Sequence, residues 1–196
     1  FAKDQVLSSF YVYQQAYDTN GKAIDGVYVD RNNDGIINSS DKYFFHSPNP
    51  DAIFGFSTKV TTGKWEFSTA LRSVIGNYVY NNAAANSSLA DITSSSYNYL
   101  RNQEKSVLTN QFSGFEYFSD LFIEDASFLR MDNLSVGYNF GDFLGNKKSN
   151  LRVTAMAQNV FVITKYTGVD PEVFGNIDNG FYQRPKVYSL GFNFQF

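Results

Sequence analysis

The last eleven residues of the chain, 186–196, alternate between large apolar side chains and mostly small or polar ones. The large apolar positions are Tyr188, Leu190, Phe192, Phe194 and Phe196. A period of two is the strand period, because successive side chains of a strand point to opposite faces. A strand with one face against lipid and the other against a wet lumen shows this pattern. The segment is therefore predicted to be a strand of a membrane barrel.

The same alternation recurs in two earlier pairs of segments, one around the tight turn Thr62-Gly63 and one around residues 141–150. The side chains predicted to face lipid are Phe54, Phe56, Trp65, Phe67, Leu71, Leu134, Val136, Tyr138, Leu151, Val153, Leu190, Phe192 and Phe194. Those predicted to face the lumen are Lys64, Glu66, Arg72, Arg152, Gln158, Asn193 and Gln195. A register slip of one residue would turn the charges to lipid, at roughly 2–4 kcal/mol for each mid-membrane Lys or Arg.

The connections between these segments alternate in length. Thr62-Gly63 and residues 141–150 are short, whereas residues 76–125 and 163–183 are long. Outer-membrane barrels have short periplasmic turns and long extracellular loops. The predicted fold is therefore all-β: an antiparallel transmembrane β-barrel segment over residues 52–196 with extracellular loops 76–125 and 163–183. Residues 1–51 are predicted to be a further extracellular loop region.

A soluble antiparallel sandwich would also alternate, and it is the alternative fold. It would have to bury the apolar face of residues 188–196 against a second sheet. It would also have to explain why the connections are long on one side only.

Composition narrows the class of protein. The 196 residues include 20 Phe, 14 Tyr and 1 Trp, yet the mean hydropathy is only -0.31. No run approaches the ~18 consecutive apolar residues of a membrane helix, which excludes a helical membrane protein. The net charge of -3 gives no electrostatic case for nucleic acid, and the absence of Cys removes disulfides and thiol chemistry.

The sequence gives no support for an enzyme. It contains no nucleophile-elbow, phosphate-cradling or dinucleotide-binding glycine motif. The pair Glu124-Asp125 has the residue types of a glycosidase, but such pairs are common on loops. His46, the only histidine, is expected to be an ordinary loop residue.

The predicted loops carry many aromatic and amide side chains. They suit sugar or peptide binding, and equally they suit packing within the loops or against a partner protein. These residues are Tyr78, Tyr80, Asn81, Asn82, Tyr97, Tyr99, Tyr117, Phe118, Tyr166 and Tyr182.

Residues 30–41 have the spacing of a calcium loop, D-x-N-x-D-G-x-x-x-x-x-D. Side-chain oxygens at loop positions 1, 3 and 5, a backbone carbonyl at 7 and an acid at 12 converge on one hard cation, and Gly at position 6 permits the turn. The predicted calcium ligands are Asp30, Asn32, Asp34, the Ile36 carbonyl and Asp41. The flanks look extended rather than helical, so a structural calcium loop is predicted; the alternative is an Asp/Asn/Gly turn that binds nothing.

Several stretches resemble, in order and spacing, the C-terminal part of the SusC/RagA family of TonB-linked outer-membrane transporters of Bacteroidetes. These stretches are residues 26–42, 47–57, 76–81, 127–134, 158–161 and 166–172. The resemblance covers nearly the whole chain and implies a plugged barrel of about 22 strands. It also implies an N-terminal plug, TonB coupling and a SusD-like surface lipoprotein, but no plug or TonB-contacting segment is matched. The chain is therefore expected to be part of a longer polypeptide.

Two functions are compatible with these observations. The first is TonB-dependent import of an oligomeric nutrient, glycan or peptide, by a multi-pass outer-membrane protein that works with a SusD-like lipoprotein. The second is a non-transporting surface protein, an adhesin or assembly component, built on the same barrel. An upstream plug with a TonB box would decide for transport.

Overall fold

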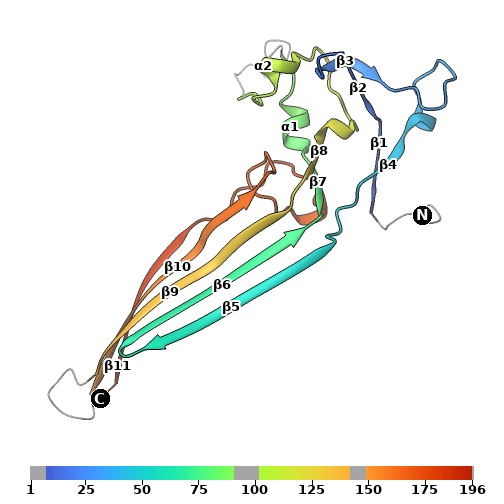
Figure 1. The fold of residues 1–196 in the computed structure, drawn as a ribbon. Helices are drawn as coiled ribbons and strands as arrows, with labels where there is room; N and C mark the ends of the chain where they lie inside the picture. Colours follow the sequence, from blue (N-terminus) through green and yellow to red (C-terminus); the bar gives the residue numbers. More distant parts are fainter. Residues whose placement is uncertain (1–7, 91–101, 142–148, 196) are drawn as a thin grey trace. The chain divides into compact units, whose positions relative to one another are not determined.

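The computed structural model describes residues 8–90, 102–141 and 149–195. Phe196, which was predicted to be an apolar position of the last strand, lies outside these residues. The chain divides into two compact units (Figure 1). The sheet unit comprises residues 51–76, 127–165 and 183–196. The loop-rich unit comprises residues 1–50, 77–126 and 166–182.

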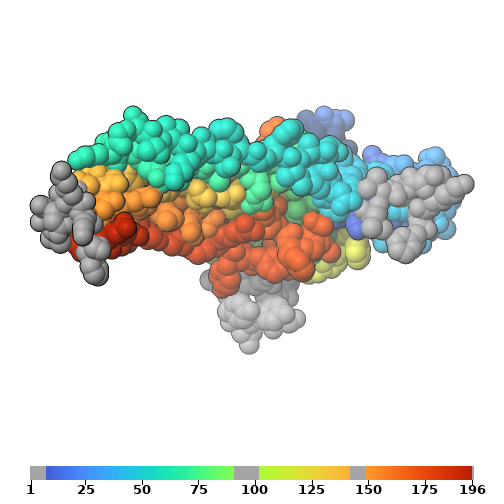
Figure 2. Space-filling view, turned by 90° about the horizontal axis from the view of Figure 1, so that it is seen from below, coloured from blue at the N-terminus to red at the C-terminus, as the bar shows by residue number. Residues whose placement is uncertain are grey.

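The sheet unit is one antiparallel sheet with the strand order β11-β10-β9-β6-β5 (Figure 1). In Figure 2 its segments are adjacent coloured bands, from cyan-green (β5 and β6) through orange to red (β11). Its strands are β5 (Ala52–Thr62), β6 (Trp65–Ile75), β9 (Phe128–Gly141), β10 (Asn150–Thr164) and β11 (Val187–Gln195). These are the five segments in which apolar and polar residues alternate. The expectation of antiparallel strands is confirmed, and β5 and β11 form the two edges of the sheet in the described part of the chain.

The pairing register brings the predicted apolar positions onto one face. Trp65 lies opposite Tyr138, which lies opposite Val153, which lies opposite Phe192. Paired residues in adjacent antiparallel strands share a face, so these four side chains form one row across the sheet. All thirteen side chains predicted for the lipid side lie on this face by the same rule.

Both short connections lie at one end of the sheet. Thr62 pairs with Trp65 across Gly63-Lys64, where Gly63 has φ +56°, a value that favours glycine. Trp65 pairs with the end of β9, and the start of β10 pairs with the end of β11. The long segments 76–127 and 165–186 therefore leave the sheet from its other end.

Two strands continue further than the alternation predicts. The pattern ends near Asn133 in β9 and near Gln158 in β10, but the strands extend to Phe128 and Thr164. The pairing register shifts between Gln158 and Phe161 in β10. Opposite this shift, Asp132 of β9 is left out of the pairing with both neighbouring strands. These β-bulges insert residues that interrupt the period of two without ending the ladder.

Among its described residues, the loop-rich unit contains three two-stranded ribbons and short helical turns. The ribbons pair β1 (Phe10–Val12) with β4 (Tyr43–Phe45), β2 (Gln15–Tyr17) with β3 (Ala23–Tyr28), and β7 (Tyr78–Tyr80) with β8 (Ile123–Asp125). The helices are α1 (Asn82–Asn86) and α2 (Val107–Asn110), and the 3-10 turns are η1 (Ser39–Asp41), η2 (Asp120–Phe122) and η3 (Phe174–Asn176). No helix among the described residues is both long and apolar enough to cross a membrane.

A small core holds the loop-rich unit together. Its buried side chains include Val12, Tyr80, Phe112 and Phe122, which come from distant parts of the sequence. The Asp120 carboxylate joins two of these segments, because it accepts hydrogen bonds from the Gln15 backbone amide at 2.9 Å and from the Tyr43 hydroxyl at 2.7 Å. The segments predicted as loops therefore fold together into a packed structure.

Candidate functional site

The polar face of the sheet carries a chain of ion pairs near the end with the short connections. Glu66 on β6 forms salt bridges with Lys59 on β5, at 3.0 Å, and with Arg152 on β10. Arg152 is two strands away from Glu66, so its side chain crosses β9 to reach the carboxylate. One carboxylate therefore connects the charges of three strands.

Gly137 of β9 makes room for this crossing. It pairs with Glu66 on one side and with Thr154 on the other. A Cβ at this position would lie 3.4 Å from Arg152 Nε and 3.5 Å from Arg152 Nη2. An added Cβ alone would make ordinary van der Waals contact with Arg152, whereas the further atoms of a long side chain would extend into the path of the guanidinium group.

We expect the substitution Gly137→Leu to destabilise the full-length protein by about 1–3 kcal/mol, because the larger side chain displaces Arg152 from Glu66. The measurement is the free energy of unfolding in detergent. Gly55→Leu is the matched control, since it lies on the same face of β5 with nothing within 4 Å of an added Cβ. Glu66→Gln should lower the free energy of unfolding less in the Gly137→Leu background than in the wild type. An equal loss in both backgrounds would show that Gly137 does not act through this ion pair.

A second ion pair lies at the bulge of β9. Asp132 accepts from Arg72 through two contacts of 3.3 Å, Nε to Oδ2 and Nη2 to Oδ1. Arg72 and Arg130 also each lie 5.6 Å from the ring centre of Phe128. The bulge turns the Asp132 carboxylate toward Arg72, which is a common effect of such an extra residue.

The predicted polar positions have one exception. Glu66, Arg72, Arg152, Gln158, Asn193 and Gln195 lie on the face opposite the apolar row by the register. Lys64 does not belong to a strand face, because it lies in the turn between β5 and β6, where its Nζ donates to the Phe140 carbonyl at 3.4 Å. In the sequence, the alternation of polar and apolar residues continues through this turn. Lys64 was therefore counted as a strand residue, although the chain reverses direction there.

The Asp-rich loop, residues 30–41, is organised by hydrogen bonds to its acidic side chains. Asp30 accepts from the backbone amides of Asn33 and Gly35, both at 2.7 Å. Asp34 accepts from the Ile36 amide at 2.8 Å and from Asn32 Nδ2 at 2.8 Å. These contacts give the loop a defined turn, and each carboxylate retains oxygen lone pairs for a further ligand.

Asp41 anchors the end of this loop. Its fully buried carboxylate accepts from the backbone amides of Asn38, at 2.9 Å, and of Arg31, at 2.9 Å. Hydrogen bonds from the backbone amide of Asn38, and then from those of Arg31 and Asn32, hold the pKa of the Asp41 carboxyl below its ordinary value. Within the described ranges no three His, Asp or Glu side chains form a group that could hold a metal.

Several of the loop aromatic and amide residues, for which the sequence left binding and packing open, make structural contacts. Tyr78 stacks on His46 at 3.8 Å between ring centres, and Tyr80 and Tyr166 are buried. The Tyr166 hydroxyl donates to Asp178 at 2.7 Å, and Asn81 caps helix α1 through the Ala84 amide. Tyr117, Phe118 and Tyr182 are exposed, while Tyr97 and Tyr99 lie outside the described residues.

The paired acids Glu124-Asp125 have a structural environment as well. Glu124 accepts from the Thr167 amide and from the Thr167 hydroxyl, both at 2.8 Å, and from Asn81 Nδ2 at 2.9 Å. Its carboxylate therefore joins residue 167 to strand β8. This arrangement is that of a structural acid.

The segment 166–182 carries an exposed apolar surface, of which sequence reasoning named only Tyr182. Phe174 is 94 % exposed, and its exposed neighbours in sequence are Val169, Ile177, Phe181 and Tyr182. No periodic pattern marks these residues, since they lie in irregular backbone around η3. Exposed aromatic side chains are typical of protein-binding surfaces.

The chain is similar to TonB-dependent receptor SusC of Bacteroides thetaiotaomicron. The identity is 41% over an alignment 196 residues long, which includes 96% of this chain. The chain belongs to the family of SusC/RagA-type TonB-dependent receptors. It spans 19% of the length of SusC and the same share of TonB-dependent receptor P3 of Formosa agariphila, to which it is 23% identical. No family model matches the chain.

Solved structures agree with the fold of this SusC/RagA-type chain. The RagAB peptide transporter superposes with a TM-score of 0.77 at 22% identity, covering 96% of this chain and 23% of that one. At this identity the likeness establishes the fold alone. TonB-dependent receptors are outer-membrane β-barrels and are not enzymes, so the expectation that the chain is not an enzyme is confirmed at the level of its relatives.

Proposed function

We propose that the chain forms C-terminal wall strands of a multi-pass outer-membrane transporter that imports oligomeric nutrients, glycans or peptides, with energy from TonB. The observation that supports this most strongly is the five-stranded sheet, with one apolar face and one face bearing ion pairs. Such a wall separates lipid from a wet lumen. Five strands cannot close a membrane barrel, since the smallest have about 8, so further strands would complete it.

The orientation follows from the connections. With the short connections on the periplasmic side, the long segments predicted as loops, 76–125 and 163–183, would be extracellular. The aromatic cluster Trp65, Tyr138 and Phe140, with ring centres 4.7 Å apart in each adjacent pair, would then lie at the periplasmic interface. Aromatic girdles are typical of that position.

The test uses the full-length precursor in a host that carries TonB. Transport predicts that radiolabelled oligosaccharide or peptide accumulates in cells with the intact receptor. Deletion of the TonB-contacting segment should abolish accumulation and leave surface display unchanged. The alternative, a non-transporting surface protein, would show surface binding that is indifferent to TonB.

We propose a SusD-like surface lipoprotein as the partner, in contact with the segment 163–183. The exposed Phe174 and Tyr182 are the apolar anchors there. Replacing both by Ser should lower co-purification of the lipoprotein in mild detergent by about fivefold or more, because exposed aromatics often dominate interfaces. Ile37→Ser, an exposed apolar change outside the two long segments, should leave co-purification unchanged; an equal loss would argue for general misfolding.

We also propose that residues 30–41 bind one calcium ion, which would stabilise the loop. The donors are Asp30, Asn32, Asp34, the Ile36 carbonyl and Asp41, and Asn38 Nδ2 already donates to that carbonyl at 3.1 Å. Asp41 is shorter than the Glu of an EF-hand, so affinity should be weak, on the order of 10⁻⁴–10⁻³ M.

Calcium titration of the full-length receptor tests this site. Asp34→Ala should abolish one weak binding event and increase hydrogen exchange over residues 30–41. Asp18→Ala is the control, because Asp18 also accepts two backbone amides in a turn, from Asn20 and Lys22, but lies outside the calcium spacing. Unchanged calcium uptake in Asp34→Ala would show that the loop is a turn that binds nothing.

A further inference from the structure

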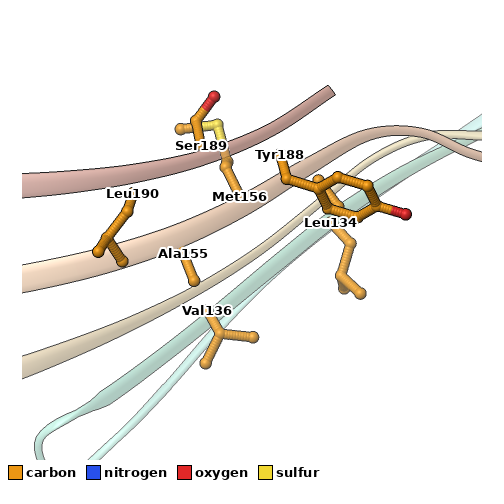
Figure 3. Close-up of a pocket in the computed structure, with 8 residues that line it drawn as sticks. Leu134, Val136, Ala155, Met156, Tyr188, Ser189 and Leu190 are labelled. Atoms are coloured by element: carbon orange, nitrogen blue, oxygen red, sulfur yellow. The ribbon is translucent and has the colours of Figure 1, made fainter. Parts of the chain in front are cut away.

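The proposed membrane placement supplies an occupant for the groove on the apolar face of the sheet. This groove is lined by Val136, Ala155 and Leu190, among others, and has a volume of about 430 Å³ (Figure 3). Acyl chains would fill it without a specific site, because this face meets lipid. The membrane does not account, in contrast, for a row of aromatic side chains in the loop-rich unit.

The aromatic row consists of five residues from three segments: Tyr11, Tyr13, Tyr28, Phe44 and Phe118. Tyr11 and Phe44 pair across β1 and β4, with ring centres 5.0 Å apart. Tyr13 stacks on Tyr28 at 4.8 Å, and the Tyr13 amide donates to the Phe118 carbonyl at 2.8 Å. Tyr11, Phe44 and Phe118 are 47 %, 40 % and 57 % exposed, so ring surface is open to a ligand.

Lys42 connects the parts of the aromatic row. It precedes Phe44 by two residues, which is the strand period, and so lies on the side of Tyr11 and Phe44. Its Nζ is 4.8 Å from the ring centre of Tyr13 and 4.5 Å from that of Phe118. Aromatic faces attract a cation at this range. The row therefore already holds one ammonium group, which belongs to the protein itself.

The aromatic row lies in a strongly acidic unit. The described residues of the loop-rich unit include thirteen Asp and Glu against four Lys and Arg, a net charge of −9, whereas those of the sheet unit include three against eight, a net charge of +5. Asp25 of this acidic unit is exposed, and hydrogen bonds from the Ser113 hydroxyl and amide hold the pKa of its carboxyl below the ordinary value. A cationic ligand is therefore attracted to the unit.

We propose that the aromatic row is a binding site for extended peptides that carry Lys or Arg at alternate positions. Alternate side chains of an extended peptide point to one face, so successive cations meet the open rings of Tyr11, Phe44 and Phe118. The acidic surroundings supply the long-range attraction. This inference rests on the proposed function, which places these segments outside the cell, and it names a substrate class for the receptor.

Charge separates this ligand class from the alternatives. An acidic peptide is repelled by the net charge of the unit, and an uncharged glycan gains nothing from it. The ammonium group of Lys42 makes the sign of the ligand charge testable, because it repels an incoming cation and would attract an incoming anion. A neutral residue at this position should therefore favour a cationic ligand.

The experiment measures binding to the full-length receptor in detergent by fluorescence anisotropy. The probe is an octapeptide of alternating Arg and Ser with an uncharged dye, and alternating Glu and Ser form the matched anionic probe. The Arg peptide should bind about tenfold more tightly or better, and added salt should reduce this preference. Phe44→Leu with Phe118→Leu should weaken its binding about fivefold, because two ring faces are lost. Phe44→Tyr with Phe118→Tyr keeps the rings and should bind as the wild type.

Lys42→Gln distinguishes a cationic ligand from structural damage, because it should tighten binding of the Arg peptide. The expected change is about threefold, the effect of one unit charge at roughly 6 Å in water. Leu108→Ser, a change of an 80 % exposed side chain elsewhere in the loop-rich unit, should leave binding unchanged.

Three results would overturn the peptide site while nutrient uptake stays intact. They are weaker binding of the Arg peptide to Lys42→Gln, displacement of this peptide by an uncharged glucose oligosaccharide, and binding of a folded basic protein, cytochrome c, without binding of the peptide. Absence of TonB-dependent uptake, with the expected peptide binding, would instead overturn the proposed function alone.

Discussion

Val136→Lys should destabilise the full-length receptor by roughly 2–4 kcal/mol, the cost of a cation on the lipid face near mid-membrane. Val136 lies in the inner strand β9, opposite Phe67 on one side and Ala155 on the other. Each of these neighbours is apolar, so the ammonium group would have no partner and would be removed from water. Urea unfolding of the receptor in lipid vesicles measures this effect.

Ser135→Lys is the control for this prediction. Ser135 is adjacent in sequence but faces the other side, between Ser68 and Met156. A lysine there would extend into the wet lumen and should change the unfolding free energy by less than about 1 kcal/mol. Equal effects of the two substitutions would contradict the assignment of the faces, and a larger effect of Ser135→Lys would reverse it.

Phe112→Ala should destabilise the loop-rich unit by about 3–5 kcal/mol, since it removes a large aromatic side chain and leaves a cavity. Phe112 is 0 % exposed and lies in the cluster that includes Val12, Tyr80 and Phe122. Hydrogen exchange of the full-length receptor should therefore increase in β1, β7 and η2, whose side chains form this cluster.

Phe115→Ala tests whether burial is the cause. Phe115 is only three residues away and is 42 % exposed, so its loss should cost less than about 1 kcal/mol. The strands of the sheet unit should keep their protection in both variants. Similar exchange in the two variants would mean that Phe112 is not a core residue of the loop-rich unit.

The sheet was predictable because its faces differ in polarity along each strand. Alternation over residues 187–195 and in the other four segments was enough to place the side chains, and the register then aligned the rows. The bulges were not predictable, because a period of two cannot distinguish an inserted residue such as Asp132 from the end of a strand. The strand ends at Phe128 and Thr164 were missed for this reason.

The loop-rich unit was less accessible to sequence reasoning. For Tyr80, Asn81 and Tyr166 the sequence left binding and packing open, because aromatic and amide side chains serve both. Their burial depends on contacts between segments far apart in sequence, such as Asn81 with Glu124. The spacing of residues 30–41 was readable from the chain, whereas its hydrogen-bond network required the folded loop.

The bulge at Asp132 has a consequence for changes in the length of this strand. Ala70 pairs with Asn133 and Leu71 with Met131, so Asp132 is extra to the ladder between β6 and β9. Deleting Asp132 would restore an uninterrupted period of two and leave Arg130 and Met131 on their present faces, at the cost of the Arg72 ion pair. Deleting Ser135 instead would reverse the faces of every residue on one side of the gap. The bulge is therefore a place where this strand can lose a residue during divergence of the family without exchanging its apolar and polar faces.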